Sequence, residues 1–303
     1  MADLELGIGL PHLDHIAASA KRAEALGYDF LSTGEHVFFY GPIGNGLIAL
    51  AAAAGATERI RLMSTITLVP LYPAALLAKL VVSLDQVSQG RFHMGVGVGG
   101  EFAKEFEACG VPVKERGART NEALELFKRL CAEEEVSFDG RFTTLSGVTL
   151  SPKPVCKPNP PIWVSGRSEA AMRRCARFGD GWLPYMYTPE KLAESLATIG
   201  AMSAEYERAA TVRPGLFIFF AVHEDRDTAV EMAANRLSKQ YNQDFSQLVY
   251  KYAIAGTPDE CIARIQAYRD AGAQTIILNS ACPQAYVDEN EALMAREVVA
   301  RLR

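Results

Sequence analysis

Short runs of branched and aromatic apolar residues alternate with longer amphipathic stretches along almost the whole chain. A run that is apolar at nearly every position is typical of a strand buried on both faces of a parallel sheet. Such runs predict strands at Leu4–Leu10, Phe30–Glu35, Ile60–Leu68, Phe92–Val98, Pro161–Ser165, Gly181–Pro184, Leu216–Val222 and Thr275–Asn279. The stretches between them predict helices, among them His15–Leu26, Pro73–Val87, Asn121–Leu130, Ser168–Phe178 and Pro189–Ala210.

The order of these segments predicts the fold. Strands and helices alternate in about eight strand-then-helix units, and no linker rich in Pro, Gly or Ser separates them. Such a chain is expected to form one α/β domain over residues 1–303, a (β/α)8 TIM barrel. Two insertions interrupt the alternation. Glu101–Arg119 follows the fourth strand, and Val136–Pro160, with the hairpin-like sequence FDGRFTTL, lies between the fourth helix and the fifth strand.

The composition is that of an ordinary globular protein and argues against nucleic acids and membranes as binding partners. Of the residues 49% are hydrophobic, and the formal net charge is −5. The 31 Lys and Arg residues are scattered among 36 Asp and Glu residues, so we expect no nucleic-acid partner. No apolar run reaches the roughly 20 residues of a membrane span, and the acidic N-terminus does not resemble a signal peptide. The six cysteines form no C-x-x-C pair and are expected to be reduced thiols, which favours a cytoplasmic protein.

Barrel enzymes place their chemistry at the carboxyl ends of the strands, so the residues there are the first candidates for a site. The second strand leads into Glu35-His36. A carboxylate beside an imidazole can act as an acid/base pair, because histidine titrates near neutral pH. The alternative is a structural ion pair at the barrel rim. The five histidines show no metal-binding spacing, so no metal ion is expected.

A glycine-rich segment follows the fourth strand. The sequence GVGVGG from Gly95 to Gly100 matches the pattern G-x-G-x-x-G of dinucleotide-binding proteins. That fingerprint requires a helix directly after the glycines and usually an N-terminal position in the fold. The later position here favours a second interpretation, in which bare backbone lets a flat ring lie against the strand end. Glu101 would then stand beside that ring.

The fifth strand ends in Ser165-Gly166-Arg167-Ser168, directly before a predicted helix. Free N–H groups at a helix N-terminus, a flexible glycine and a cation form an anion site, and phosphate is the usual occupant. The alternative is an ordinary glycine turn with Ser168 as the N-cap.

Several segments, in order along nearly the whole chain, resemble the bacterial luciferase-like monooxygenase superfamily, and within it the deazaflavin-dependent oxidoreductase branch. They read AKRAEALGYDFLSTGEH, PAALLAKLVVSLDQVSQGRFHMGVGVGGE, GVPVKERGARTNEALELFKRL, PPIWVSGRSEAAMRRCARFGDGW and GTPDECIARIQAYRDAGAQTIIL. The resemblance implies a (β/α)8 barrel that is usually a homodimer or a larger assembly and binds coenzyme F420 or FMN at its carboxyl mouth.

The resemblance also implies roles for residues of this chain. The ring would lie near the ends of strands two to four, and the phosphate near the end of strand five. A non-proline cis peptide is expected in the third strand, at Thr65–Ile66 or at the neighbouring bond. The residues expected to contact the cofactor are Thr65, Ile66, Val98, Gly99, Ser165, Gly166, Arg167 and Ser168. The residues expected to be catalytic are Glu35, His36 and Glu101.

The sequence therefore predicts an oxidoreductase that transfers a hydride between coenzyme F420 and a small organic substrate. His36 or Glu101 would handle the accompanying proton, and Glu35 would orient His36. One alternative is an FMN-dependent monooxygenase that takes reduced flavin from a partner reductase. Another is a flavin-binding or storage protein without catalysis, against which the two acid/base candidates argue.

The sequence does not identify the substrate. The two insertions and the loop Phe38–Asn45 would shape its pocket. Phe38, Phe39 and Tyr40 indicate either an apolar or planar partner or a dimer interface. The aromatic segment Tyr241–Tyr252 is either a lid or a packed helix.

Overall fold

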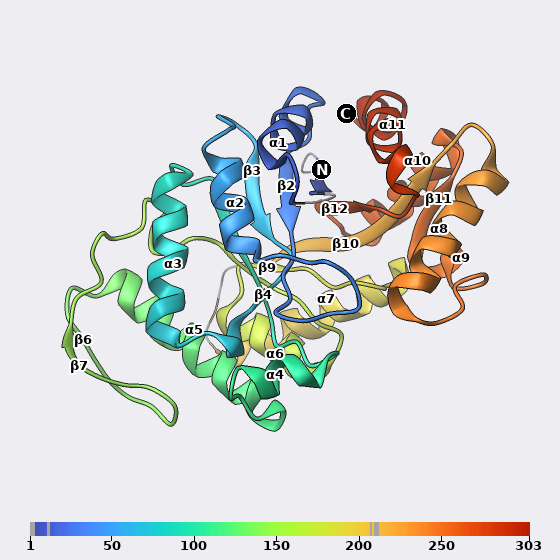
Figure 1. The fold of residues 1–303 in the computed structure, drawn as a ribbon. Helices are drawn as coiled ribbons and strands as arrows, with labels where there is room; N and C mark the ends of the chain where they lie inside the picture. The colour runs from blue at the N-terminus through green and yellow to red at the C-terminus, as the bar shows by residue number, and fades with distance from the viewer. Residues whose placement is uncertain (1–3, 11–12, 207, 209–211) are drawn as a thin grey trace.

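The computed structural model describes residues 4–10, 13–206, 208 and 212–303, which form a closed barrel of eight parallel strands surrounded by helices (Figure 1). The strands succeed one another around the barrel in chain order, and the last pairs with the first, where Leu6 lies opposite Ile276. The predicted (β/α)8 barrel is confirmed. Its strands are β1 (Glu5–Gly9), β2 (Phe30–Thr33), β3 (Arg61–Ser64), β5 (Phe92–Gly97), β8 (Ile162–Val164), β9 (Gly181–Trp182), β10 (Arg213–Val222) and β12 (Thr275–Ser280).

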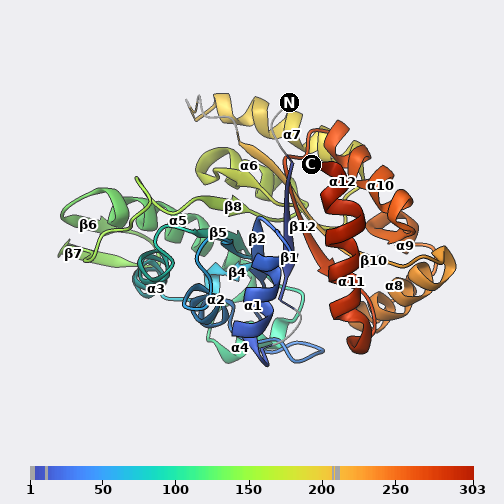
Figure 2. The same cartoon turned by 90° about the horizontal axis from the view of Figure 1, so that it is seen from above.

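Helices cover the outside of the barrel, as the view from above shows (Figure 2). They are α1 (Ile16–Ala25), α2 (Gly46–Ala54), α3 (Ala74–Val87), α4 (Ala103–Ala108), α5 (Arg116–Ala132), α6 (Glu169–Phe178), α7 (Pro189–Ala204), α8 (Arg226–Tyr241), α9 (Val249–Tyr252), α10 (Pro258–Asp270), α11 (Val287–Leu293) and α12 (Ala300–Leu302). Within the described ranges, none of them has the length and apolar character that crossing a bilayer requires. The predicted helix Pro189–Ala210 ends at Ala204, and its positions 207, 209 and 210 lie outside the described residues.

Shorter elements complete the fold. The 3-10 turns are η1 (Val69–Leu71), η2 (Val113–Glu115) and η3 (Gln284–Tyr286), and the π-helical segment η4 (Met294–Val299) joins α11 to α12. The insertion before the fifth barrel strand contains the expected hairpin, whose strands β6 (Val136–Asp139) and β7 (Thr144–Val148) pair antiparallel. Both views place this hairpin at the edge of the molecule, away from the barrel (Figures 1 and 2).

The sequence did not predict strand β11 (Ala253–Gly256), which lies parallel to the end of β10 with Val222 opposite Gly256. Its sequence AIAG has only four residues, three of them Ala or Gly, so it lacks the run of β-branched and aromatic residues that is typical of a strand. Of the two interpretations of Tyr241–Tyr252, the packed one fits the structure. Phe245 and Val249 are buried in one apolar cluster with Phe219 of β10.

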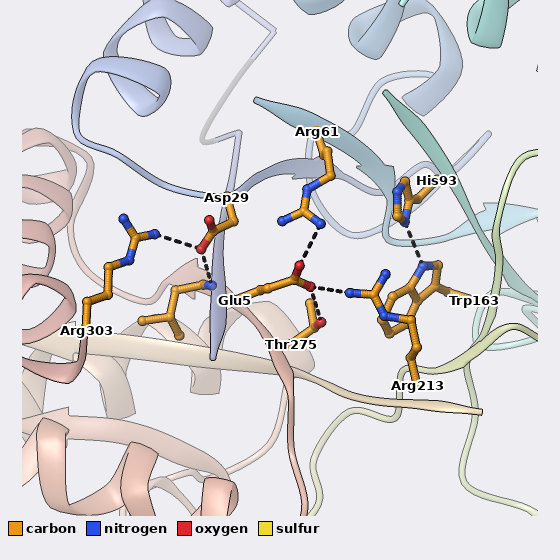
Figure 3. A network of polar contacts seen from close by, with 9 residues as sticks. Glu5, Asp29, Arg61, His93, Trp163, Arg213, Thr275 and Arg303 are labelled. Carbon is orange, nitrogen blue, oxygen red and sulfur yellow. Dashed lines mark hydrogen bonds and ion pairs between the residues drawn. The ribbon is translucent and has the colours of Figure 1, made fainter. Parts of the chain in front are cut away.

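Apolar side chains fill the middle of the barrel, and a polar network closes its amino-terminal end. Phe30, Met63 and Trp163 belong to the interior cluster. Below them, Glu5 accepts hydrogen bonds from Arg61 (2.7 Å), Arg213 (2.6 Å) and Thr275 (2.9 Å) (Figure 3). In the same view the indole of Trp163 donates to Nδ1 of His93 at 3.0 Å. These contacts close the end of the barrel that is opposite the expected site.

The buried His93 makes the stability of the fold depend on pH. Burial, followed by the charges of Arg61 and Arg213, lowers the pKa of His93 from 6.5 to about 3. The unfolded chain therefore binds this proton near pH 6.5, while the folded chain binds it only near pH 3. As the pH falls from 6.5, the unfolded state takes up more protons. The free energy of unfolding is expected to fall by up to about 1.4 kcal/mol per pH unit through this residue.

Urea unfolding of wild type and His93→Gln at pH 7.5, 6 and 5 tests this expectation, since glutamine can accept the Trp163 hydrogen bond without titrating. The wild type should lose stability toward pH 5 more steeply than the variant. Parallel pH profiles for the two proteins would show that His93 is not the group responsible.

Candidate active site

The barrel brings the expected site residues together at the carboxyl ends of four adjacent strands, β2, β3, β5 and β8. Glu35 and His36 follow β2, and the peptide Thr65–Ile66 follows β3. Residues 98–101 follow β5, and residues 165–168 follow β8. Glu35 is buried, Glu101, Arg167 and Ser168 are exposed, and the others are half-buried. The structure thus places every predicted site residue on one side of the barrel mouth.

The predicted third strand is divided in two at this mouth. It consists of β3 and of β4 (Thr67–Leu68), and the peptide bond between Thr65 and Ile66 is cis, as expected. Where the ladder to β5 is interrupted, the Ser64 hydroxyl bridges it. Its Oγ accepts from the Gly95 N–H at 2.9 Å and donates to the Gly95 carbonyl at 2.9 Å. The side chain of Ser64 thereby replaces backbone pairing beside the cis peptide.

Gly95 and Gly97 of β5 leave room for the segment that follows β3. A Cβ on Gly95 would lie 1.9 Å from the carbonyl oxygen of Ser64, and a Cβ on Gly97 would lie 1.7 Å from Cδ1 of Ile66. The interpretation that these two glycines admit a flat ring is therefore corrected, because protein atoms already occupy the space. The dinucleotide fingerprint is not needed to explain them either.

The imidazole of His36 is held by a carboxylate that the sequence did not single out. Glu105 lies on α4, is fully buried, and places its two carboxylate oxygens 3.2 and 3.1 Å from Nδ1 of His36. The backbone N–H of Val37 donates to the same carboxylate at 3.2 Å. The ring of Phe39 stacks on the imidazole, with 4.1 Å between ring centroids and 16° between planes. His36 is thus fixed both at its edge and on its face.

The role expected for Glu35 as the partner of His36 is corrected by these contacts. One oxygen of Glu35 accepts from the Leu68 N–H at 2.9 Å. The other accepts from the Tyr72 hydroxyl at 2.9 Å, from the Asn45 amide and from the Gly46 N–H. Burial raises the pKa of Glu35, and the hydrogen bonds from Leu68, Tyr72 and Gly46 oppose that shift. This carboxyl group joins the end of β2 to the start of α2 and to β4.

Glu101 has a partner that the sequence also missed. The hydroxyl of Tyr185, just after β9, donates to Glu101 Oε1 at 2.6 Å. The guanidinium of Arg167 lies 4.8 Å from the centroid of the Tyr185 ring. Burial and then the neighbouring Glu101 raise the pKa of Tyr185 to about 12, so the phenol stays protonated at neutral pH. A tyrosine outside every recognisable motif carries no sequence signal for such a role.

The end of the fifth strand has the predicted local structure. The Ser168 side chain accepts from the Ala171 N–H at 3.3 Å and caps α6. Gly166 has φ 142°, and a Cβ there would lie 2.6 Å from Cβ of Ala171. This confirms the N-cap, whereas the anion site at the same helix start stays a prediction.

A cavity of about 270 Å³ lies beside His36, between the loop after β2, η1 and the residue that follows α4. Its lining residues combine polar and apolar side chains: Glu35, His36, Val37, Asn45, Leu68, Leu71, Tyr72 and Cys109. One wall of this cavity is therefore formed by His36, the histidine that the sequence predicts as an acid/base residue.

A closed barrel with acid/base side chains gathered at the carboxyl ends of its strands is typical of (β/α)8 barrel enzymes. The chain belongs to the luciferase-like monooxygenase family, whose model matches residues 2–275. It is 31% identical over 182 residues to an FMNH2-dependent dimethylsulfone monooxygenase from Pseudomonas putida, which covers 59% of this chain and 50% of that protein.

Solved structures agree with this assignment. The monooxygenase RslO1 from Streptomyces bottropensis superposes with a TM-score of 0.87 at 26% identity, covering 99% of this chain and 100% of that one. An F420-dependent secondary alcohol dehydrogenase, solved with an F420-acetone adduct, superposes with a TM-score of 0.85 at 20% identity, covering 99% of each chain. Structural neighbours of the same fold thus include both F420-dependent and FMN-binding enzymes.

Proposed function

We propose that this protein is an oxidoreductase that transfers a hydride between coenzyme F420 and a small organic substrate at the carboxyl mouth of the barrel. The observation that carries the proposal is the fixed imidazole of His36. Glu105 and Phe39 hold the ring, while its Nε2 has no hydrogen-bond partner among the described residues. An immobilised imidazole with one available nitrogen suits a group that transfers a proton.

The residues at the mouth fit a flat ring with an anionic tail. Ser32 lies on the same face of β2 as Phe30, which belongs to the barrel interior. Its Oγ is buried with no hydrogen-bond partner in the described part of the chain, and the polar edge of a ring would provide one. The first turn of α6 and the exposed Arg167 offer donors to a phosphate.

The chain's own groups would then bind the cofactor and carry the proton. When bound, the deazaflavin supplies the two-electron hydride chemistry. Oxidation of an alcohol carbon by hydride loss also releases the hydroxyl proton, and the reverse reaction takes one up. His36 through Nε2, or Glu101, would hold that proton. Tyr185 would keep Glu101 in place through its 2.6 Å hydrogen bond.

FMN-dependent oxygenation is the second candidate, and the identities to the two monooxygenases favour it. It would use the same mouth and take reduced flavin from a partner reductase. Glu35-His36 and the Gly-Gly-Glu101 sequence match the deazaflavin branch better and favour F420. A binding protein without catalysis would have no use for a fixed imidazole. The homodimer implied by the resemblance stays a prediction.

Titration with each cofactor tests the proposal. We expect F420 to quench the intrinsic Trp and Tyr fluorescence at micromolar concentration, and FMN to bind more weakly. Arg167→Ala should weaken F420 binding by about 10- to 100-fold, because it removes a charge-assisted contact to the phosphate. Arg173→Ala is the matched control, since Arg173 lies on α6 and pairs with Glu169 and Glu205 on the surface.

Tighter binding of FMN than of F420 would favour the monooxygenase candidate. Equal losses in the two arginine variants would contradict the phosphate site at the start of α6. If neither cofactor binds, the proposed function is wrong.

A further inference from the structure

We propose that Glu105 is a positioning residue that fixes the proton of His36 on Nδ1, which leaves Nε2 as the nitrogen that accepts a proton from the substrate. Glu105 lies 69 positions from His36 in the sequence, on the short helix α4. The catalytic half of this inference rests on the proposed function. The tautomer itself is a property of the protein alone and can be measured without cofactor or substrate.

The geometry makes an ionised Glu105 an acceptor for the imidazole. Both oxygens of Glu105 lie within hydrogen-bond distance of Nδ1, at 3.2 and 3.1 Å, and the Val37 N–H already donates to Oε2. An ionised carboxylate can only accept hydrogen bonds, so Nδ1 must be the donor. In a neutral imidazole one nitrogen carries the proton and the other is an acceptor. Nε2 is therefore the basic nitrogen of His36.

The surroundings keep this arrangement in place. The side chain of Glu105 is completely buried, while that of His36 remains 18% exposed. Phe39 covers one face of the imidazole and holds its plane, and a half-turn of the ring within that plane would lose the contact between Nδ1 and Glu105. A carboxylate that fixes the tautomer and orientation of a catalytic histidine is the arrangement of the serine protease triad.

Two other histidines provide internal references with the opposite tautomer. Nδ1 of His93 accepts from the indole of Trp163 at 3.0 Å. Nδ1 of His223 accepts from the backbone N–H of Asp225 at 2.9 Å. Because Nδ1 accepts in both, their neutral rings carry the proton on Nε2.

Nitrogen NMR of the whole protein labelled with 15N-histidine tests the proposal directly. Two-bond 1H–15N correlations distinguish protonated from unprotonated ring nitrogens. They should be recorded over a pH series that extends to about 9, well above the usual range of histidine titration. The His36 signals are assigned by their loss in His36→Gln. We expect protonated Nδ1 for His36 and protonated Nε2 for His93 and His223.

The variant Glu105→Leu removes the acceptor. His36 should then lose the pure Nδ1–H pattern, while the signals of His93 and His223 stay unchanged and report that the barrel is folded. Glu107→Leu is the matched control, because Glu107 is an exposed residue of the same helix. If Glu105→Leu does not fold, Glu105→Gln, which preserves the shape, takes its place and should mix the two tautomers.

The proposal is overturned if His36 carries its proton on Nε2 in the wild type, as it would if a protonated Glu105 donated to Nδ1. It is also overturned if the tautomer is the same with and without the carboxylate.

Kinetics test whether Glu105 acts through His36. With F420 as cofactor, Glu105→Leu should lower kcat by about 10- to 100-fold and leave the KM for substrate nearly unchanged, whereas Glu107→Leu should match the wild type. The double variant with His36→Gln should be no slower than His36→Gln alone, since residues that act as a unit are not additive. Additive losses would contradict the positioning role. Absence of any F420 activity in the wild type would refute the proposed function and leave the NMR result standing.

Discussion

Replacing His36 by glutamine is expected to lower the rate of hydride transfer by about 100- to 10,000-fold, the usual contribution of a general acid or base. Glutamine keeps the size and polarity of the side chain but cannot exchange a proton at neutral pH. Because Arg167 and the start of α6 are the groups expected to bind the phosphate, the affinity for F420 should change little. Stopped-flow absorbance of the deazaflavin, with a panel of small alcohols and ketones, measures the rate.

Glu101→Gln separates the two proton carriers. If His36 carries the proton, Glu101→Gln should lower the rate less than His36→Gln does. A larger loss in Glu101→Gln would assign the proton to Glu101 and leave His36 a binding residue. If His36→Gln and Glu101→Gln both react at the wild-type rate, neither side chain transfers the proton.

Gly95→Ala is expected to destabilise the fold by at least about 3 kcal/mol, or to prevent folding, because overpacking against backbone cannot relax locally. The new Cβ would lie 1.9 Å from the Ser64 carbonyl oxygen. To make room, β3 and β5 would have to separate and break both hydrogen bonds between the Ser64 hydroxyl and Gly95. Urea unfolding gives the free energy.

Gly97→Ala provides the contrast. Its Cβ would meet Cδ1 of Ile66 at 1.7 Å, the end of a side chain and not a backbone atom. Ile66→Val removes that atom, so Gly97→Ala with Ile66→Val should be more stable than Gly97→Ala alone. The same Ile66→Val change should not rescue Gly95→Ala. A double-mutant cycle measures the difference, and equal rescue of both glycine variants would contradict the packing described here.

Hydrophobic periodicity predicted the elements well because it is a local property. The runs of β1, β5 and β12 are apolar enough to be recognised without a neighbour. Sequence-based prediction of the elements failed where contact with a neighbouring strand of the same protein decides the structure. Strand β11 becomes a strand because the end of β10 offers it a partner, and its own four residues are too small to predict it.

The sequence by itself determined the barrel and predicted the strand ends at which the candidate acid/base side chains, among them His36 and Glu101, lie together. Only the tertiary structure decided how those side chains are partnered. Glu35 and His36 lie beyond the last residue of β2, and the Glu35 carboxyl group accepts hydrogen bonds from Gly46 of α2 and from Leu68, with none from His36 among the described contacts. The imidazole is instead held by Glu105, which α4 brings across the barrel rim. A contact between segments so far apart depends on strand order and helix docking, and no local pattern encodes either.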